Sequence, residues 1–351
     1  MAGILIQGVG AIGGLLAGGL LRAGEQVTLV TANPDITAAI NRDGISLASP
    51  DGAFWVAAEA HTSLADLPPD RRFGSAYLAM MAGAVVESAS ASLPLLTDDG
   101  YVVAYQNGFV EEAIGKAIGI ERVISATVAL GCNMETPGVY RRTTPGRIII
   151  GEMDGRASAR IEALRETLAH VIKTEISHNI VGVLWGKLLW NGSVSALCAA
   201  SGKRLGDLFD CAIGRELFLL AFRESVDTAR AEGIRIEHVI VNPDDYYLDA
   251  KDSPRRREEI LTAMEPFVKK YAGVIPSTLR SLERGRRSEI DFLNGYILEK
   301  ARGSRLKTPL NEAVIQMIHD IEAGRRSIDP ANLDELFGEL DKRTQAAGED
   351  A

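Results

Sequence analysis

The chain has 351 residues, of which 46% are hydrophobic and 24% are charged. These proportions are typical of a globular protein, and the length suits about two domains. The formal net charge of −9 argues against nucleic acid or an anionic membrane surface as a partner, because both repel an acidic protein. Neither the three cysteines nor the five histidines have the spacing of metal ligands. We therefore expect no metal, and free thiols in a reducing compartment such as the cytoplasm.

The amino-terminal segment has the pattern of a nucleotide-binding βαβ unit. An apolar run over 4–6 leads into a G-x-G-x-x-G loop, then a helical run to Leu21 and a strand-like run over 26–30. The first glycine of such a loop permits a tight turn, the second admits a pyrophosphate, and the third lets helix pack on strand. The helix N-terminus adds free N–H groups and a positive dipole end. The predicted dinucleotide-binding residues are Gly8, Val9, Gly10, Ala11, Ile12 and Gly13.

The same uncharged run, from Ala2 to Leu21, also has the length of a membrane span. Its many glycines would make a poor isolated span, and no basic segment precedes it as in a signal peptide. Nothing later in the chain resembles a second span. We therefore predict that the run belongs to the nucleotide-binding domain and not to a membrane.

The segment after the second strand normally separates NAD from NADP. An acid there binds the ribose 2′-hydroxyl of NAD, whereas an arginine accommodates the 2′-phosphate of NADP. Here residues 31–33 are Thr-Ala-Asn, with neither group. Thr31 and Asn33 are able to hydrogen-bond a phosphate, so NADP(H) is favoured and NAD(H) stays open. Asp35 follows a proline and is expected to be a turn or helix-cap residue.

Strand signals continue through the first half of the chain. Residues 44–47 and 54–57 are predicted to form a hairpin across a Ser-Pro-Asp-Gly turn. Apolar runs predict the strands of one sheet at 73–80, 101–105, 123–128, 138–142, 147–151 and 174–177. The fold class is therefore α/β, with an N-terminal Rossmann-type doubly wound sheet over 1–178.

From residue 179 onward helical periods dominate, and strand signals vanish. We predict an all-helical C-terminal domain over 179–335 for substrate and catalysis. A polar C-terminal tail is expected over 336–351.

Asn107 and Gly108 follow the predicted strand 101–105. Ligands of open parallel sheets bind outside the carboxyl ends of the strands, which would bring Asn107 to a nicotinamide or substrate. The alternative is that Asn-Gly simply makes a turn.

The most informative helical stretch runs from 181 to 195. It is almost wholly apolar, and Lys187, Asn191 and Ser195 recur every four residues on one face. Burial among leucines and tryptophans would lower the pKa of Lys187 and make it a usable proton donor. The alternative is a lysine that extends along the apolar surface to solvent.

A second stretch runs from Pro276 to Gly295. Ser288 and Asp291 have the spacing of a capping box, which predicts a helix with Glu289 in its first turn. Glu289 would stabilise the helix dipole there even without a catalytic role. The apolar face of the predicted helix comprises Ile290, Leu293, Ile297 and Ala301.

Together, the glycine loop, the Asn-Gly, the W-x-K-x-x-x-N helix and the P-S-x-L…G-R-x-x-E-I-D-x-x-N-G stretch resemble the ketopantoate reductases (2-dehydropantoate 2-reductases) over nearly the whole chain. The resemblance implies that Lys187 is the general acid and that Glu289 binds cofactor ribose and the substrate hydroxyl. It implies that the substrate is held by Asn107, Lys187, Asn191 and Ser277, and Ser195, on the same helix face as Lys187 and Asn191, is a further candidate. Asn107 would also lie near the nicotinamide.

The activity implied is NAD(P)H-dependent reduction of a small 2-keto acid, 2-dehydropantoate or a relative, as in pantothenate biosynthesis. The chain departs from the family pattern at Met81, Ser195 and Ser281. Two alternatives stay open. One is an opine-type or other 2-hydroxy-acid dehydrogenase, and the other is a nucleotide-binding protein that has lost turnover. The apolar helical domain is also compatible with a homodimer.

Overall fold

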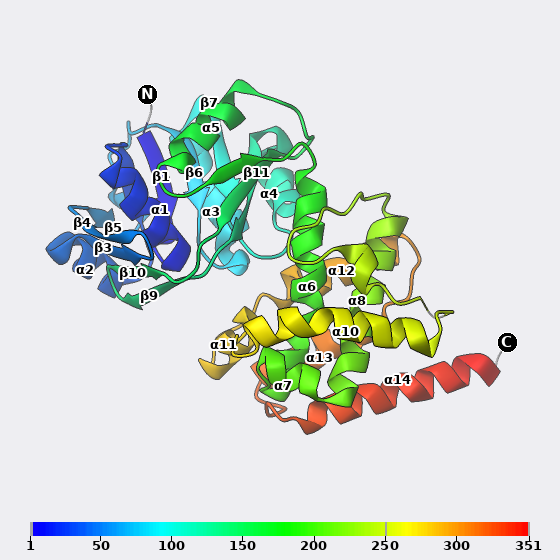
Figure 1. Cartoon of the computed structure of the whole chain (residues 1–351). Helices are drawn as coiled ribbons and strands as arrows, with labels where there is room; N and C mark the ends of the chain where they lie inside the picture. Colours follow the sequence, from blue (N-terminus) through cyan, green and yellow to red (C-terminus); the bar gives the residue numbers. More distant parts are fainter. Residues whose placement is uncertain (1–2, 250, 350–351) are drawn as a thin grey trace. The chain divides into compact units, whose positions relative to one another are not determined.

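The computed structural model describes residues 3–249 and 251–349, with side chains as far as residue 340 (Figure 1). The chain folds as two compact units that divide between Ile180 and Val181. The division falls one short step beyond the boundary predicted at 178–179, inside the first turn of a long helix.

The first unit is built on a sheet of eight strands in the order β12-β11-β8-β7-β6-β1-β2-β5. All neighbouring pairs are parallel except β8 and β11. The strands are β1 (Gly3–Gln7), β2 (Val27–Val30), β5 (Ala60–His61), β6 (Phe73–Leu78), β7 (Leu96–Ala104), β8 (Val123–Ala129), β11 (Arg147–Glu152) and β12 (Thr174–Ile176). The predicted Rossmann-type sheet is confirmed.

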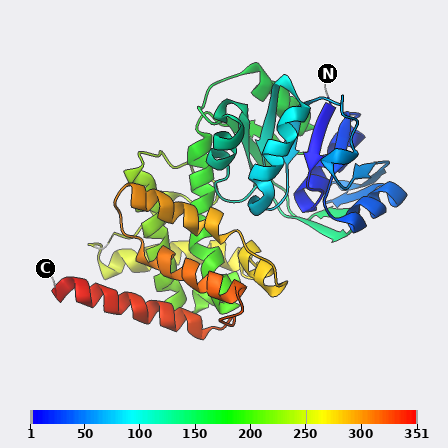
Figure 2. The same cartoon turned by 180° about the vertical axis from the view of Figure 1, so that it is seen from behind.

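Helices cover both faces of this sheet, as a doubly wound fold requires. α1 and α5 lie on one face (Figure 1), and α3 and α4 lie on the other, which Figure 2 shows from behind. The helices are α1 (Ala11–Arg22), α2 (Pro34–Asp43), α3 (Val85–Ser92), α4 (Glu111–Ile118) and α5 (Ala159–Ala169), with single 3₁₀ turns at Leu64–Asp66, Ala82–Ala84, Leu93–Leu95 and Ile120–Arg122.

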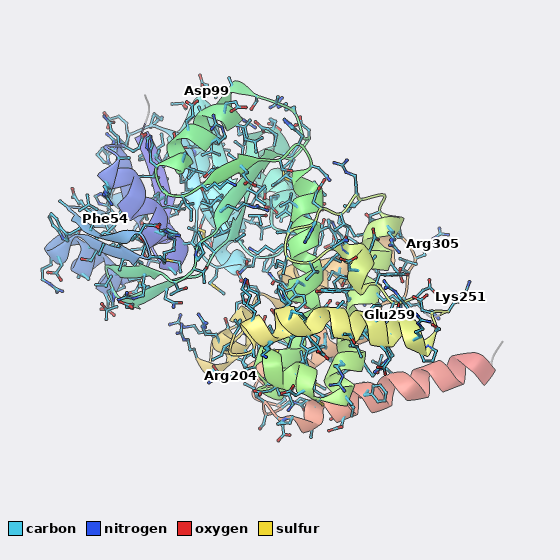
Figure 3. The ribbon with its side chains drawn as sticks, viewed as in Figure 1. Phe54, Asp99, Arg204, Lys251, Glu259 and Arg305 are labelled. Carbon is cyan, nitrogen blue, oxygen red and sulfur yellow. The ribbon has the colours of Figure 1, made fainter. Side chains whose placement is uncertain are left out.

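A second sheet, in the order β4-β3-β10-β9, packs against α1. The hairpin of β3 (Ile45–Ser49) and β4 (Gly52–Val56) is antiparallel, as predicted. Phe54 of β4, labelled in Figure 3, lies under the guanidinium of Arg22, 4.4 Å from the ring centroid. This cation–π contact joins the small sheet to the C-terminal end of α1.

The prediction that residues 138–142 belong to the main sheet is wrong. They form β10 (Val139–Arg142), which pairs with β3 and with β9 (Cys132–Thr136) in the small sheet. The physical reason is Tyr140, which is fully buried against α1. A Cβ atom at Gly14 would come within 2.1 Å of the Tyr140 ring. The glycine-rich sequence of α1 therefore allows close packing inside the unit.

The second unit is all-helical over its described residues, as predicted. Its helices are α6 (Ile180–Ser201), α7 (Leu205–Asp210), α8 (Ala212–Ala231), α9 (Pro243–Tyr246), α10 (Pro254–Tyr271), α11 (Ser277–Glu283), α12 (Asn294–Gly303), α13 (Pro309–Glu322) and α14 (Ala331–Glu349), with the 3₁₀ turn η5 at Ile290–Phe292.

Helix α6 forms the centre of this unit. Within the described chain it is the one helix long and apolar enough to cross a membrane, yet 83% of its most apolar window is buried in the protein. Trp190 packs edge-on against Phe218 of α8 and Phe267 of α10, with ring centroids 5.6 and 4.6 Å away. Its apolar sequence is thus explained by burial among neighbouring helices.

The prediction of a polar tail from residue 336 is not supported by the backbone, because α14 begins at Ala331 and continues to Glu349. Leu333, Leu336 and Leu340 are all buried. Their spacing of three and four residues places them on one helix face, which anchors the start of α14. Residues 350 and 351 lie outside the described part of the chain.

Candidate active site

The strand order of the first unit reverses direction at β1, between β2 and β6. Such a switch point opens a crevice outside the carboxyl ends of the strands, where nucleotides bind in doubly wound sheets. The glycine loop follows β1 directly, and Met80 and Met81 follow β6. The fold therefore presents the predicted loop at the expected edge of the sheet.

Each glycine of the loop has a distinct steric role. Gly8 has φ +85°, and a Cβ atom there would lie 2.7 Å from the Met80 nitrogen. A Cβ atom at Gly13 would lie 1.8 Å from the Gly8 carbonyl oxygen, so a side chain cannot fit between helix and strand. At Gly10 a Cβ atom would meet nothing within 4 Å. Only Gly10 is therefore dispensable for the fold itself, and it borders open space.

The N-terminus of α1 supplies the electrostatics that an anion needs. Gly10 is the N-cap, and the first helical hydrogen bond joins the Gly14 nitrogen to the Gly10 oxygen at 2.8 Å. The N–H groups of residues 11–13 therefore lack acceptors within the helix. No acidic residue occupies the first turn, so the positive dipole end is not neutralised. The loop fits the pyrophosphate of a dinucleotide.

Two side chains of the small sheet contact backbone carbonyls of the glycine loop. The Tyr140 hydroxyl donates to the Val9 carbonyl at 2.8 Å. The Cys132 thiol lies 3.3 Å from the Ala11 carbonyl, and burial raises the pKa of this thiol to about 11, so it stays a donor. Sequence reasoning missed both residues, because a tyrosine and a cysteine more than 100 positions away carry no local signal for this contact.

Tyr140→Phe is expected to remove the hydrogen bond to Val9 and to leave the ring packed at Gly14. We expect a loss of about 1 kcal/mol in the free energy of unfolding, as for a typical buried hydrogen bond. Dinucleotide affinity should fall by a few fold, since the loop loses one restraint. Denaturant unfolding and fluorescence titration measure the two effects. Tyr247→Phe is the matched control, because it loses a hydroxyl bond to Asp227 in the other unit. Equal loss of affinity in both variants would contradict the account.

The segment expected to select the cofactor differs in detail from the prediction. The Asn33 side chain accepts a hydrogen bond from the Asp35 nitrogen at 2.9 Å and is the N-cap of α2. Asn33 therefore has the capping role expected of Asp35, which sits in the first turn. Thr31 is buried, with 6% of its surface exposed, whereas Ala32 and Asn33 are exposed.

The ends of β6 and β7 are joined by Gln106. Its amide donates to the Leu78 carbonyl at 2.8 Å and to the Met80 carbonyl at 3.0 Å. Asn107 follows as a half-buried residue, and Gly108 has φ +85°, which is a turn conformation. The turn alternative and a ligand-binding Asn107 are therefore compatible. Sequence reasoning missed Gln106, although its position at a strand end was the available signal.

The predicted polar face of α6 is less buried than the rest of the helix. From 182 to 201 every residue is buried except Lys187 and Asn191, which are half-buried. Ser195 lies one turn further along the same face, with 5% of its surface exposed. Lys187 and Asn191 are therefore partly accessible to solvent on the same face of a helix that is otherwise buried.

Glu289 lies just before η5, with 8% of its surface exposed. The predicted capping box is not formed. The Ser288 hydroxyl donates to Glu322 at 2.7 Å, and Asp291 pairs with His319 at 2.9 Å. The Ser288 hydroxyl also accepts from the Ile290 nitrogen at 3.3 Å, at the start of the 3₁₀ turn η5, and helix α12 begins only at Asn294. The predicted apolar face is buried at Ile290, Leu293, Ile297 and Ala301.

The structure brings two of the predicted segments together inside the second unit. Asn294 on α12 donates to the Gly192 carbonyl of α6 at 2.8 Å. The Tyr296 ring packs against Trp185, with centroids 5.9 Å apart. The Glu289 turn is therefore adjacent in the chain to a helix that contacts the Lys187 segment. Ser277 is the exposed first residue of α11, and the next two residues of that turn are buried.

A Rossmann unit with an open glycine loop, followed by a helical unit, is an arrangement suited to a nucleotide-dependent oxidoreductase. The family model described as ketopantoate reductase PanE/ApbA matches residues 4–155, and its C-terminal model matches residues 179–322. The chain belongs to the ketopantoate reductase PanE/ApbA family. The resemblance predicted from the sequence motifs is confirmed, and so is the expected class of activity, reduction of a keto acid to a hydroxy acid.

Curated relatives agree along nearly their whole length. The 2-dehydropantoate 2-reductase of Pyrococcus horikoshii is 27% identical over 309 residues, which cover 88% of this chain and 93% of the relative. The 2-dehydropantoate 2-reductase of Halobacterium salinarum is 24% identical, with coverage of 90% and 97%.

Solved structures share the fold. A PanE/ApbA family ketopantoate reductase from Ralstonia eutropha JMP134 superposes with a TM-score of 0.77 at 24% identity, covering 92% of this chain and 98% of the other. A D-mandelate dehydrogenase in a ternary structure with NADH and anilino(oxo)acetate has the same TM-score and coverage at 19% identity. At such identities the likeness concerns architecture.

Proposed function

We propose that the protein reduces a small 2-keto acid, 2-dehydropantoate or a close relative, to the 2-hydroxy acid, with NADPH as the hydride donor. The observation that carries the proposal is the polar face of α6, where Lys187 and Asn191 alone remain half-buried. A cation and an amide on an otherwise apolar helix suit a carbonyl that becomes an alkoxide and a carboxylate that stays charged. The names of the curated relatives support the choice of keto acid.

The bound nicotinamide supplies a hydride to the keto carbon of the substrate. Lys187 holds the carbonyl oxygen, stabilises the negative charge that develops on it, and gives it a proton from Nζ. Asn191 lies one helical turn further and binds the substrate carboxylate, together with Ser195 and Ser277. Glu289 orients the new hydroxyl and the cofactor ribose, and Asn107 contacts the nicotinamide. Dinucleotide binding rests on the glycine loop, 8–13, with Thr31 near the adenosine ribose.

The preference for NADPH rests on charge. Residues 31–33 contain no carboxylate to repel a 2′-phosphate or to hold a free 2′-hydroxyl. Because they also contain no arginine, we expect a moderate preference and not an absolute one. Two structures of D-mandelate dehydrogenase with the same fold contain NADH, so both cofactors belong in the test. The three free thiols suit a reducing compartment, and we place the enzyme in the cytoplasm.

The test is a panel of 2-keto acids, with and without added amines, followed by cofactor oxidation with NADH and NADPH in parallel. We expect the highest kcat/KM with 2-dehydropantoate and NADPH. A higher value for an aromatic 2-keto acid would replace the proposed substrate, and dependence on an amine would indicate an opine-type dehydrogenase. Dinucleotide binding without oxidation across the panel would refute the catalytic proposal altogether.

A further inference from the structure

A chain of buried hydrogen bonds links four helices of the second unit. Glu224 of α8 accepts from the backbone nitrogens of Leu310 and Asn311 at 2.9 and 3.0 Å, and from the Asn311 amide at 2.6 Å. Asn311 of α13 accepts in turn from the Asn294 amide at 2.9 Å. The same Asn294 amide donates to the Gly192 carbonyl of α6 at 2.8 Å. This series of hydrogen bonds therefore runs from α8 through α13 and α12 to α6.

The direction of this hydrogen-bond chain is fixed by its two ends. Glu224 accepts at one end, and the Gly192 carbonyl accepts at the other. Both asparagine side chains must therefore orient their N–H groups and oxygens in one way only. A flipped Asn294 would bring its oxygen against two acceptors. In the native orientation the Asn294 oxygen is buried without a hydrogen-bond partner in the described part of the chain. Burial of this oxygen without a partner costs free energy, which the two hydrogen bonds donated by the Asn294 amide offset.

The three side chains that form this series of hydrogen bonds are buried away from solvent. Asn294 and Asn311 each expose 1% of their surface, and Glu224 exposes 5%. Glu224 also sits at the N-terminus of α13, where the helix dipole favours a carboxylate, and Thr308 makes no side-chain cap there. Water therefore cannot replace these hydrogen bonds. Removal of one side chain leaves the donor or acceptor of its neighbour without a hydrogen-bond partner.

The last hydrogen bond of the series, from Asn294 to Gly192, reaches α6 beside the proposed catalytic groups. Gly192 follows Asn191 directly, and Lys187 lies just over one turn earlier. A Cβ atom at Gly192 would lie 3.0 Å from the Ile297 side chain, so the glycine lets α12 approach α6 closely. Residues 290–292 form the 3₁₀ turn η5, and Leu293, with φ −103° and ψ −92°, separates this turn from α12. The Glu289 turn is therefore joined to α12 through Leu293 and is not part of that helix.

We propose that Asn294 is a positioning residue for the reduction, held in its single orientation by Asn311 and Glu224. Its amide fixes the distance and register between the Glu289 turn and the α6 face that carries Lys187 and Asn191. This inference rests on the proposed catalytic roles of Lys187 and Glu289. Loss of the amide lets α12 and α6 shift against each other, and misplacement of an acid by about 1 Å costs up to roughly a hundredfold in rate.

The test compares Asn294→Ala with Asn332→Ala. Asn332 is also buried, at 4% exposure, and its amide also donates to a carbonyl of α6, that of Ala200 at 2.8 Å. It differs in contacting the end of the helix remote from Lys187. Both variants should lose similar stability in denaturant unfolding. Asn294→Ala should lower kcat by about tenfold to a hundredfold, whereas Asn332→Ala should keep kcat near that of the wild type. Equal kcat values in the two variants would overturn the proposal.

A second readout does not depend on turnover. Acetic anhydride labels lysine amines, and peptide mass spectrometry reports the rate at Lys187 relative to the exposed Lys116 of α4. Asn294→Ala should change this ratio several fold, and Asn332→Ala should not. If Asn294→Ala does not fold, Asn294→Ser retains a shorter donor and should show the same change to a smaller extent. An unchanged ratio in the Asn294 variant refutes the positioning role. A changed ratio in a chain that reduces no keto acid would refute the proposed function alone.

Discussion

Lys187→Ala is expected to lower turnover by about two to four orders of magnitude, the usual contribution of a general acid. The residue is half-buried on a helix whose other side chains, Asn191 excepted, are enclosed from 182 to 201. Removal of the amine leaves the alkoxide without charge stabilisation and without a proton. Dinucleotide affinity should change little, because the glycine loop belongs to the other unit. Steady-state kinetics and a fluorescence titration with NADPH measure the two quantities.

Lys203→Ala is the matched control for this experiment. Lys203 is also half-buried and lies just beyond the C-terminus of α6, so its loss tests for a general effect of removing a cation from this region. We expect its kcat to match that of the wild type. Unchanged turnover in the Lys187 variant would remove Lys187 from the mechanism, whatever the control shows.

Gly10→Val is expected to weaken dinucleotide binding strongly while leaving the fold intact. A Cβ atom at Gly10 meets no protein atom within 4 Å, so the branched side chain extends into the space before the N-terminus of α1. It would occupy the place of the pyrophosphate. We expect affinity to fall by about a hundredfold or more, which corresponds to roughly 2.8 kcal/mol. Denaturant unfolding without ligand should be close to that of the wild type.

Gly13→Ala gives the complementary result. Its Cβ atom would lie 1.8 Å from the Gly8 carbonyl oxygen, a backbone atom that cannot move aside alone. We expect a loss of about 1–3 kcal/mol or more in the free energy of unfolding, as for other overpacked sites. If Gly10→Val kept its dinucleotide affinity, the loop would not be the dinucleotide site, and equal destabilisation of the two variants would contradict the steric difference between Gly10 and Gly13.

The sequence predicted the elements whose signals are local. The glycine loop, the flanking strands and the apolar α6 all read directly from spacing and composition, because sterics and burial act within a few residues. The polar face of Lys187 and Asn191 was also predictable, since helical periodicity fixes it.

The sequence did not predict which distant partners those elements find. The strand 138–142 was recognised, but its sheet was not, because pairing with β3 depends on Tyr140 reaching α1. The absence of a reciprocal capping box at Ser288 and Asp291 was not predictable either, since Ser288 donates to Glu322 and Asp291 pairs with His319, both far away in the sequence. The hydrogen-bond chain from Glu224 to Gly192 spans separations of up to 102 positions and has no local signature.

In the proposed reaction, this protein transfers hydride from NADPH to a keto acid, and Lys187 supplies the proton. The most direct measurement is the stoichiometry of the reaction of the wild-type protein with 2-dehydropantoate and NADPH. The account predicts one pantoate formed for each NADPH oxidised, and a rate that collapses in Lys187→Ala. NADPH that binds but is not consumed in the presence of 2-dehydropantoate would contradict it.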